Sequence, residues 1–376
     1  MSTIETPSPG MGSMVLQGLV KLSMRVGTFA LSLTALVATL LYIKQDSMLY
    51  FPEIQGLPRR PEDNPAGYRS PDEHEVSSYD DVYIVCDDNK TIHAWLILRT
   101  KEKNNLPTLI FFHGNAGNIG LRIPNALHML QHLNSNILMV EYRGYGNSDS
   151  VKPTEAGLKK DAQAALKFIS KHPKIDASKL FIFGRSLGGA VAFDLAQYAE
   201  ENNIPLAGVI VENTFLSIAK MVDQLMPMIA PLKSLVLRIG WNSCDIVPKL
   251  TLPVLYLAGR RDELVPHSHM LDLFKATTKS RLPKIHIIKR GTHNETWLKG
   301  GQAYWDAIKS FMAEAQNAPG SIVTSISSKT ESSPVIPVGT DSDSSIPIMP
   351  SGLMGLARES MRDINEEQAS GKKKEL

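Results

Sequence analysis

The sequence predicts an α/β protein in which a mostly parallel central sheet is covered by helices on both faces, preceded by one apolar N-terminal helix. Two observations lead to this fold class. From about residue 81 onward, short strands that are apolar along both faces alternate with amphipathic helices, which is typical of parallel strands buried between two helical layers. Ahead of them, residues 26–43 form an uncharged, mostly apolar run at the lower length limit for a membrane-spanning helix.

The N-terminal part is interpreted as a membrane anchor. Residues 1–25 form a flank ending in Lys21 and Arg25, and residues 26–43 form the span. A cleaved signal peptide would need a small-x-small site after the apolar core, and residues 40–45 offer none. A buried core helix would carry a polar stripe, which is missing here. We therefore expect a single-pass membrane protein, with the bilayer as its partner, in an endomembrane such as the ER or at the cell surface.

The remaining chain divides into a connector at 44–80, a catalytic domain at 81–317 with a short cap around 216–245, and a Ser/Pro-rich tail at 318–376. The connector is rich in proline and charge and is predicted to be extended. The Met- and Leu-rich cap would form an apolar wall for an acyl chain, a bilayer contact, or short helices packed on the sheet edge; we favour the last. The tail has no core-forming periodicity, so we expect it to be disordered.

Within the domain, hydrophobic patterning predicts each element in turn. Two β-rich runs around Asp87-Asp88-Asn89-Lys90 predict a hairpin. Later apolar runs are too short for helices and predict buried strands, whereas the longer segments between them have helical periodicity. The expected strands are 81–86, 91–98, 109–112, 137–140, 181–183, 206–211, 252–258 and 285–288, and the expected helices are 121–133, 154–172, 188–199 and 302–315.

Composition excludes several functional classes. The 376 residues carry 40 basic and 38 acidic side chains, a formal net charge of +2, so no nucleic-acid-binding footprint is present. Cys86 and Cys244 fit no metal-ligand spacing, and the sequence has no dinucleotide-binding glycine loop. We therefore expect no metal, no cofactor and no nucleic-acid partner.

The stretch FIFGRSLGGA at 181–190 carries the strongest functional signal. It combines an apolar strand, a G-x-S-x-G-G motif and a small-residue helix start, so Ser186 would lie on a tight strand-to-helix turn. Gly184 and Gly188 would leave room for that turn. The N–H of Leu187, at the helix N-terminus, would then stabilise an oxyanion. The motif alone is common by chance and also fits a glycine-rich turn; its flanking strand and helix favour a nucleophile.

A serine nucleophile needs an adjacent base that is itself oriented by a carboxylate. In the α/β-hydrolase fold the chain order is serine, acid, histidine. Asp262 follows the strand at 252–258, and His293 follows the final strand, so both are expected at the same sheet edge as Ser186. The competing residues are Glu212 and Glu263 for the acid, and His267 and His269 for the base.

A second oxyanion donor is expected in the loop after the third strand, HGNAG at 113–117. We predict that the backbone N–H of Asn115 pairs with that of Leu187. His113 is expected to support the loop rather than to act as an acid or base.

The blocks HGNAGNIG, EYRGYGNS, FGRSLGGAVA, VENTFLSI and GTHNETW, after one apolar anchor, resemble the alpha/beta hydrolase domain-containing protein 13 family and its bud-emergence-type relatives in fungi and plants. The similarity spans about residues 49–312. The resemblance implies an α/β-hydrolase fold, a single-pass protein of type II, and a charge-relay system on Ser186, Asp262 and His293. Relatives with HGNA-type loops remove acyl groups from protein cysteines, which is an analogy for substrate.

These features together predict a membrane-anchored serine esterase or thioesterase acting through an acyl-enzyme on lipid or S-acyl-protein esters. A serine peptidase of the same fold and a non-catalytic membrane scaffold are the alternatives. The basic residues before the span favour a cytoplasmic N-terminus, so the sequons at Asn89 and Asn294 would meet the glycosylation machinery. Asn89 is the better acceptor, because a glycan on Asn294 would crowd His293.

Overall fold

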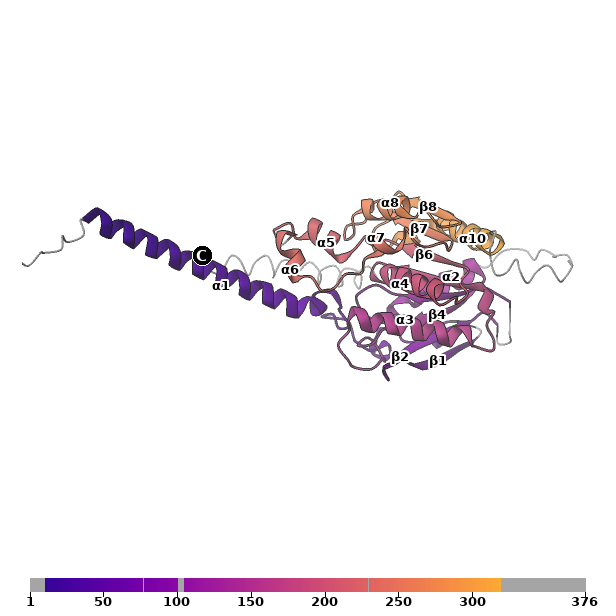
Figure 1. Cartoon of the computed structure of the whole chain (residues 1–376). Helices are drawn as coiled ribbons and strands as arrows, with labels where there is room; N and C mark the ends of the chain where they lie inside the picture. Colours follow the sequence, from indigo (N-terminus) through magenta and orange to yellow (C-terminus); the bar gives the residue numbers. More distant parts are fainter. Residues whose placement is uncertain (1–10, 77, 101–104, 229, 319–376) are drawn as a thin grey trace, which may run out of the picture.

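The computed structural model describes residues 11–76, 78–100, 105–228 and 230–318 (Figure 1). It consists of a long N-terminal helix attached to one end of a domain built on a central sheet. The expected tail lies, from residue 319 on, outside the described residues, as do the first ten residues.

The sheet in the described part of the chain has eight strands in the order β1-β2-β4-β3-β5-β6-β7-β8. The β1–β2 and β2–β4 pairs are antiparallel and all the other pairs are parallel. The strands are β1 (Ser78–Val85), β2 (Thr91–Leu98), β3 (Thr108–Phe112), β4 (Asn136–Val140), β5 (Leu180–Arg185), β6 (Gly208–Glu212), β7 (Val254–Gly259) and β8 (Pro283–Ile288). The mostly parallel sheet expected from the sequence is confirmed.

Every residue of β3, β4, β5, β6 and β7 is buried, because helices cover both faces of these strands. One core lies between the sheet and α3, α4 and α8, and the other between the sheet and α2 and α10. The helices are α1 (Met11–Leu49), α2 (Ile123–Leu133), α3 (Glu155–Ser170), α4 (Leu187–Glu201), α5 (Ile218–Leu225), α6 (Lys233–Val236), α7 (Ser243–Ile246), α8 (His267–Ala276), α9 (Thr296–Lys299) and α10 (Gly301–Asn317). Short 3-10 turns are η1 (Pro61–Asp63), η2 (Pro71–Glu73), η3 (Ile119–Arg122), η4 (Ala177–Lys179) and η5 (Ala230–Leu232).

The first residue of β1 differs from the expected one, because strand pairing rather than the hydrophobic pattern determines where this strand begins. β1 was expected from residue 81 but begins at Ser78, because it pairs with β2 along its whole length, from Ser78 opposite Leu98 to Val85 opposite Thr91. These first residues are only partly buried, so alternation of polar and apolar side chains does not reveal them.

Helix α1 extends beyond the expected span of 26–43 in both directions. It is long and apolar enough to cross a membrane, and its side chains up to Ile43 are mostly exposed. Only its last turns bury polar side chains, Gln45 and Asp46, against the domain. The connector after α1 is also anchored: Tyr50 is buried, and Phe51 forms an isolated parallel bridge with Ala116.

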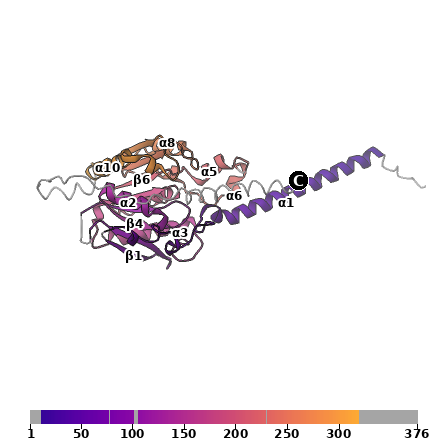
Figure 2. The same cartoon turned by 180° about the vertical axis from the view of Figure 1, so that it is seen from behind.

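The cap lies at the end of the domain from which α1 leaves, in both Figure 1 and Figure 2. Its last helix, α7, packs against α4 and α8, as short helices on a sheet edge would. Helix α5, in contrast, has no buried residue. Its Ile218 and Met221 are only partly buried, although they pack against the core, so α5 is held more loosely than α7.

Candidate active site

Ser186 occupies the turn between β5 and α4, with the backbone angles φ 54° and ψ −119°. This conformation is strained for a residue with a Cβ, so the surroundings must hold it. The Ser186 N–H donates to the Glu212 carbonyl at 2.9 Å, and the Ser186 carbonyl accepts from the Gly189 N–H at 2.9 Å and the Thr214 hydroxyl at 2.7 Å. The serine side chain remains partly exposed at the carboxyl edge of the sheet.

The turn at Ser186 is possible because the backbones of β5, α4 and the end of β3 meet with no side chain between them. A Cβ added at Gly184 would lie 2.1 Å from the Gly188 carbonyl oxygen, and one at Gly188 would lie 2.1 Å from the Phe112 carbonyl oxygen. Backbone atoms of β5, α4 and the end of β3 therefore touch around Ser186. Gly114, in the following loop, has more room, since its added Cβ would lie 3.7 Å from the nearest atom, the Ser186 Cβ.

Asp262 and His293 come from the loops after β7 and β8, and the structure brings them together. His293 Nδ1 lies 2.8 Å from Asp262 Oδ2 and 3.0 Å from Oδ1, with both side chains almost fully buried. Asp262 Oδ1 also accepts the N–H groups of Leu264 at 2.9 Å and Val265 at 2.8 Å, which fixes the carboxylate. When Nδ1–H donates to Asp262, the neutral ring keeps Nε2 as an acceptor.

The Ser186 hydroxyl and the His293 ring follow β5 and β8 at the same edge of the sheet. Among the described residues, the hydrogen bonds include the Asp262–His293 pair but none between Ser186 Oγ and His293 Nε2. Contacts of this kind are often long until substrate is bound. The loops after β5, β7 and β8 thus carry a serine, a carboxylate and a histidine in the expected chain order.

The competing acids are engaged elsewhere. The buried Glu212 carboxylate forms an ion pair with Arg185 and accepts from the Tyr304 hydroxyl at 2.5 Å. Glu263 accepts from the backbone N–H of His293 at 3.1 Å, so it holds the loop and not the ring nitrogen.

The competing histidines are not paired with Asp262. His269 lies on α8, where its Nδ1 accepts from the Leu216 N–H at 3.2 Å and its Nε2 lies 2.9 Å from Gln224 Oε1. His267 is the first residue of that helix.

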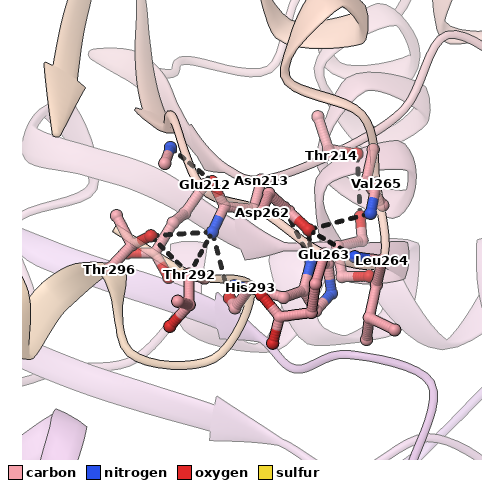
Figure 3. A network of polar contacts seen from close by, with 12 residues as sticks. Glu212, Asn213, Thr214, Asp262, Glu263, Leu264, Val265, Thr292, His293 and Thr296 are labelled. Atoms are coloured by element: carbon pink, nitrogen blue, oxygen red, sulfur yellow. Dashed lines mark hydrogen bonds and ion pairs between the residues drawn. The ribbon is translucent and has the colours of Figure 1, made fainter. Parts of the chain in front are cut away.

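Sequence reasoning gave no role to Asn213, which lies at the centre of the network in Figure 3. Its Nδ2 is 3.1 Å from the Thr292 carbonyl, 3.0 Å from the His293 carbonyl and 2.9 Å from the Thr296 hydroxyl. Its Oδ1 accepts the Gly259 N–H at 2.8 Å. One side chain therefore ties the ends of β6 and β7 to the loop that carries His293. The sequence did hold one signal for this role: an asparagine stands directly after a buried strand, and asparagine tolerates the positive φ of 49° that is observed there.

The loop after β3 lies against the nucleophile turn and is tied to the end of α1. The Asn115 side chain donates to the Leu49 carbonyl at 3.0 Å, and the Asn115 carbonyl accepts from the Phe51 N–H at 2.9 Å and the Tyr145 hydroxyl at 2.8 Å. The Gly117 N–H donates back to the Phe51 carbonyl at 3.1 Å. Leu187 begins α4, so its N–H has no acceptor within the helix.

His113 is fully buried beneath this loop. Its Nδ1 lies 2.7 Å from the Gly114 carbonyl, its Nε2 lies 3.2 Å from Glu141 Oε1, and its own carbonyl accepts from the Tyr142 hydroxyl at 2.9 Å. This environment fits a residue that supports the loop from behind.

The two sequons differ in exposure. Asn89 is exposed in the β1–β2 turn, with φ 57°, whereas Asn294 is partly buried beside His293. In the described part of the chain, no group of three or more His, Cys, Asp or Glu side chains is arranged to hold a metal ion.

The glycine packing gives the first prediction. Gly188→Ala should lower the free energy of unfolding by about 1–3 kcal/mol or more, since backbone atoms cannot move away from the new methyl group. For a domain of this size that lowers Tm by roughly 2–4 °C per kcal/mol. Thermal unfolding of the detergent-solubilised full chain measures the effect. Gly114→Ala is the matched control and should melt close to the wild type; equal losses in both variants would contradict the argument.

The second prediction concerns Asn213. Asn213→Gly keeps the backbone angle available but removes all side-chain bonds to the His293 loop, so kcat should fall roughly 10- to 100-fold through misplacement of the base. Ester hydrolysis by the purified full chain measures kcat and KM separately. Asn203 has a similar φ of 55° but is exposed after α4, so Asn203→Gly should leave both constants unchanged. An unchanged kcat in Asn213→Gly would rule out the positioning role.

Residues 103–242 match the family model described as serine aminopeptidase, S33. The chain is 36% identical to the alpha/beta hydrolase domain-containing protein WAV2 of Arabidopsis thaliana, over 73% of this chain and 89% of that protein. It is 35% identical to the protein bem46 of Schizosaccharomyces pombe, over 78% and 95%. It is 34% identical to the uncharacterized membrane protein YNL320W of Saccharomyces cerevisiae, over 75% and 94%.

Solved structures agree on the fold. The esterase Pf2001 of Pyrococcus furiosus superposes with a TM-score of 0.54 at 17% identity, covering 66% of this chain and 94% of that one. The hyperthermophilic esterase of Pyrobaculum calidifontis gives a TM-score of 0.50 at 15% identity, over 64% and 86%. With the relatives covered almost end to end and the strand order of an α/β-hydrolase, the chain belongs to the family of alpha/beta hydrolase domain-containing proteins.

Proposed function

We propose that this chain is a membrane-anchored serine hydrolase that cleaves ester or thioester bonds through an acyl-enzyme. The observation that carries the proposal is the buried Asp262–His293 pair, at 2.8 Å, at the same sheet edge as a serine held at a strained strand-to-helix turn. A purely structural role for this chain would need neither the strain nor the pair, which argues against a scaffold.

In the proposed reaction, Ser186 Oγ attacks the acyl carbon while its proton passes to His293 Nε2. The charge that develops on the carbonyl oxygen is stabilised by the backbone N–H groups of Leu187 and Asn115. Asp262 accepts from Nδ1–H and stabilises the imidazolium. His293 then protonates the departing alcohol or thiol. In the second half-reaction the same ring takes a proton from water, which attacks the acyl carbon, and returns that proton to Ser186 Oγ as the carboxylic acid leaves.

Lipid esters and S-acyl proteins are the proposed substrates, because α1 would hold the site beside a bilayer where such acyl groups reside. A serine peptidase is the second candidate. The description of the family model over residues 103–242 favours it, since that description is of an aminopeptidase.

The third prediction tests the triad. Ser186→Ala should abolish fluorophosphonate labelling while its melting temperature stays near that of the wild type. His293→Ala should lower kcat by roughly 10⁴-fold or more, and Asp262→Asn by roughly 10³- to 10⁴-fold, because triad members act as a unit. Hydrolysis of a p-nitrophenyl ester by the solubilised full chain measures both.

Glu263→Gln is the control for the acid. Its carboxylate contacts the His293 backbone and not the ring, so its effect should be mild. A larger loss of kcat in Glu263→Gln than in Asp262→Asn would show that Glu263 is the acid. Fluorophosphonate labelling that persists in Ser186→Ala would show that Ser186 is not the nucleophile.

The fourth prediction concerns orientation. We propose a type II arrangement, in which a cytoplasmic N-terminus carries Lys21 and Arg25 and the hydrolase domain is lumenal or extracellular. The exposed Asn89 should then carry a glycan, seen as a mobility shift of the full chain after glycosidase treatment, which Asn89→Gln abolishes. An unshifted band together with protease digestion of the domain in sealed microsomes would reverse the orientation and favour a cytosolic S-acyl-protein thioesterase.

A further inference from the structure

The cap exposes an unusual amount of apolar surface. Leu225, at the end of α5, is 60% exposed, Met228 is 82% exposed, and Leu235, on α6, is 78% exposed. We call these three side chains the cap tip. Among the described residues outside α1, the other exposed large apolar side chains are Tyr83, Val85 and Ile287, which lie on strands of the sheet. Clustered exposure of this kind marks an interaction surface.

The cap is fixed to the end of α1 by buried hydrogen bonds. Gln45 donates from Nε2 to the Val236 carbonyl at 3.0 Å, and its Oε1 accepts the N–H groups of Arg238 at 2.9 Å and Ile239 at 3.1 Å. The Arg238 guanidinium pairs with the buried Asp46. Trp241, just after the cap tip, donates to the Tyr50 hydroxyl at 2.9 Å. The position of α1 therefore sets the position of the cap.

The residues around this junction are those of a membrane interface. Tyr42 is exposed on α1, with the Arg238 guanidinium 6.0 Å from its ring centre, and Lys44 is exposed two residues further along α1. Tyrosine and basic side chains favour the level of the lipid headgroups. In both views, α5 and α6 lie beside the C-terminal part of α1 and not at the opposite end of the domain (Figures 1 and 2).

We propose that the cap tip is inserted into the headgroup–acyl boundary of the same bilayer that α1 crosses. This inference rests on the membrane-anchoring part of the proposed function. The bilayer is the occupant because the exposed apolar part of α1 reaches Ile43, two residues before Gln45 and Asp46 bind the cap, and α6 itself contacts α1. A short apolar surface beside tyrosine and basic side chains, here Tyr42, Lys44 and Arg238, lies in the interface rather than spanning it.

The first helix of the cap, α5, is separated by one short loop from a residue that contacts Ser186. Helix α5 follows directly on Thr214–Ser217, and the Thr214 hydroxyl donates to the Ser186 carbonyl. At its other end, α5 is held to α8 by the contact between Gln224 and His269. The substrate class that fits this arrangement is an ester or thioester whose acyl chain stays in the bilayer while its carbonyl reaches Ser186.

Site-directed fluorescence on the full chain in phosphatidylcholine vesicles with a minority of phosphatidylserine tests the proposal. The background is Cys244→Ser. Cys86 is buried, and burial raises the pKa of its thiol to about 12, so it will not label at neutral pH. An environment-sensitive dye is attached to Met228→Cys, to Leu33→Cys within α1, and to Val85→Cys, which is 67% exposed on β1 and serves as the aqueous control.

The expected result is quenching by doxyl-labelled lipid at positions 228 and 33, and quenching by iodide at position 85. Iodide quenching at 228 with lipid quenching at 33 would overturn the inference and leave the anchor intact. Protection at 228 from both quenchers would assign the cap tip to a protein surface instead, which also overturns it. Iodide quenching at position 33 would show that α1 lies in water and does not cross the bilayer, which would overturn both the membrane anchor and this inference.

An activity measurement separates insertion from catalysis. The triple variant Leu225→Ser, Met228→Ser, Leu235→Ser should keep its kcat/KM on a soluble short-chain ester, because all three side chains are largely exposed to solvent. On a long-chain ester embedded in vesicles its rate should fall by roughly tenfold or more, as apolar area is removed from the bilayer contact. Equal rates on the embedded ester would overturn the proposal; loss on both esters would place the cap tip in the site itself and would also overturn it.

Discussion

The arrangement of this site depends on one constraint, the contact of backbone with backbone around Ser186. Because Gly184 and Gly188 have no side chains, the start of α4 can lie against β5 and against the end of β3. That contact sets the positive φ of Ser186, and it also places the loop after β3 beside the serine. Ser186, the proposed nucleophile, and the proposed oxyanion donors are therefore positioned by the same backbone packing.

The proposed base, His293, and its carboxylate, Asp262, are positioned differently, by hydrogen bonds between loops. Asn213 joins the ends of β6 and β7 to the His293 loop, and two backbone N–H groups hold Asp262. On the α10 side of the sheet, Glu212 neutralises the buried Arg185 and binds Tyr304. A buried charge with a partner removed is strongly destabilising, so Glu212 serves the fold at a position where a carboxylate might otherwise be taken for the catalytic acid.

The sequence predicted the layers of the fold and most element ends to within a few residues, because buried parallel strands and amphipathic helices have strong local patterns. It also predicted which strand ends carry Ser186, Asp262 and His293, whose catalytic roles stay predictions. It did not reveal Asn213, the full length of β1 or the attachment of α1. Each of these depends on partners distant in the chain: Asn213 on residues near 292, β1 on its pairing with β2, and Gln45 on the segment after α6. Local periodicity carries no information about such partners.

The hydrogen bonds between Asn115 and the Leu49–Phe51 segment connect the end of α1, the proposed membrane anchor, to the loop beside Ser186. A rigid helix of this length converts a small change of tilt in the bilayer into a displacement at its end. Any displacement that moves Leu49 relative to the domain must either break these hydrogen bonds or carry the Asn115 peptide with it. In the proposed membrane-anchored arrangement, membrane thickness and lateral tension would therefore act on the same loop that lies against Ser186, and the lipid environment would be part of the geometry of the site.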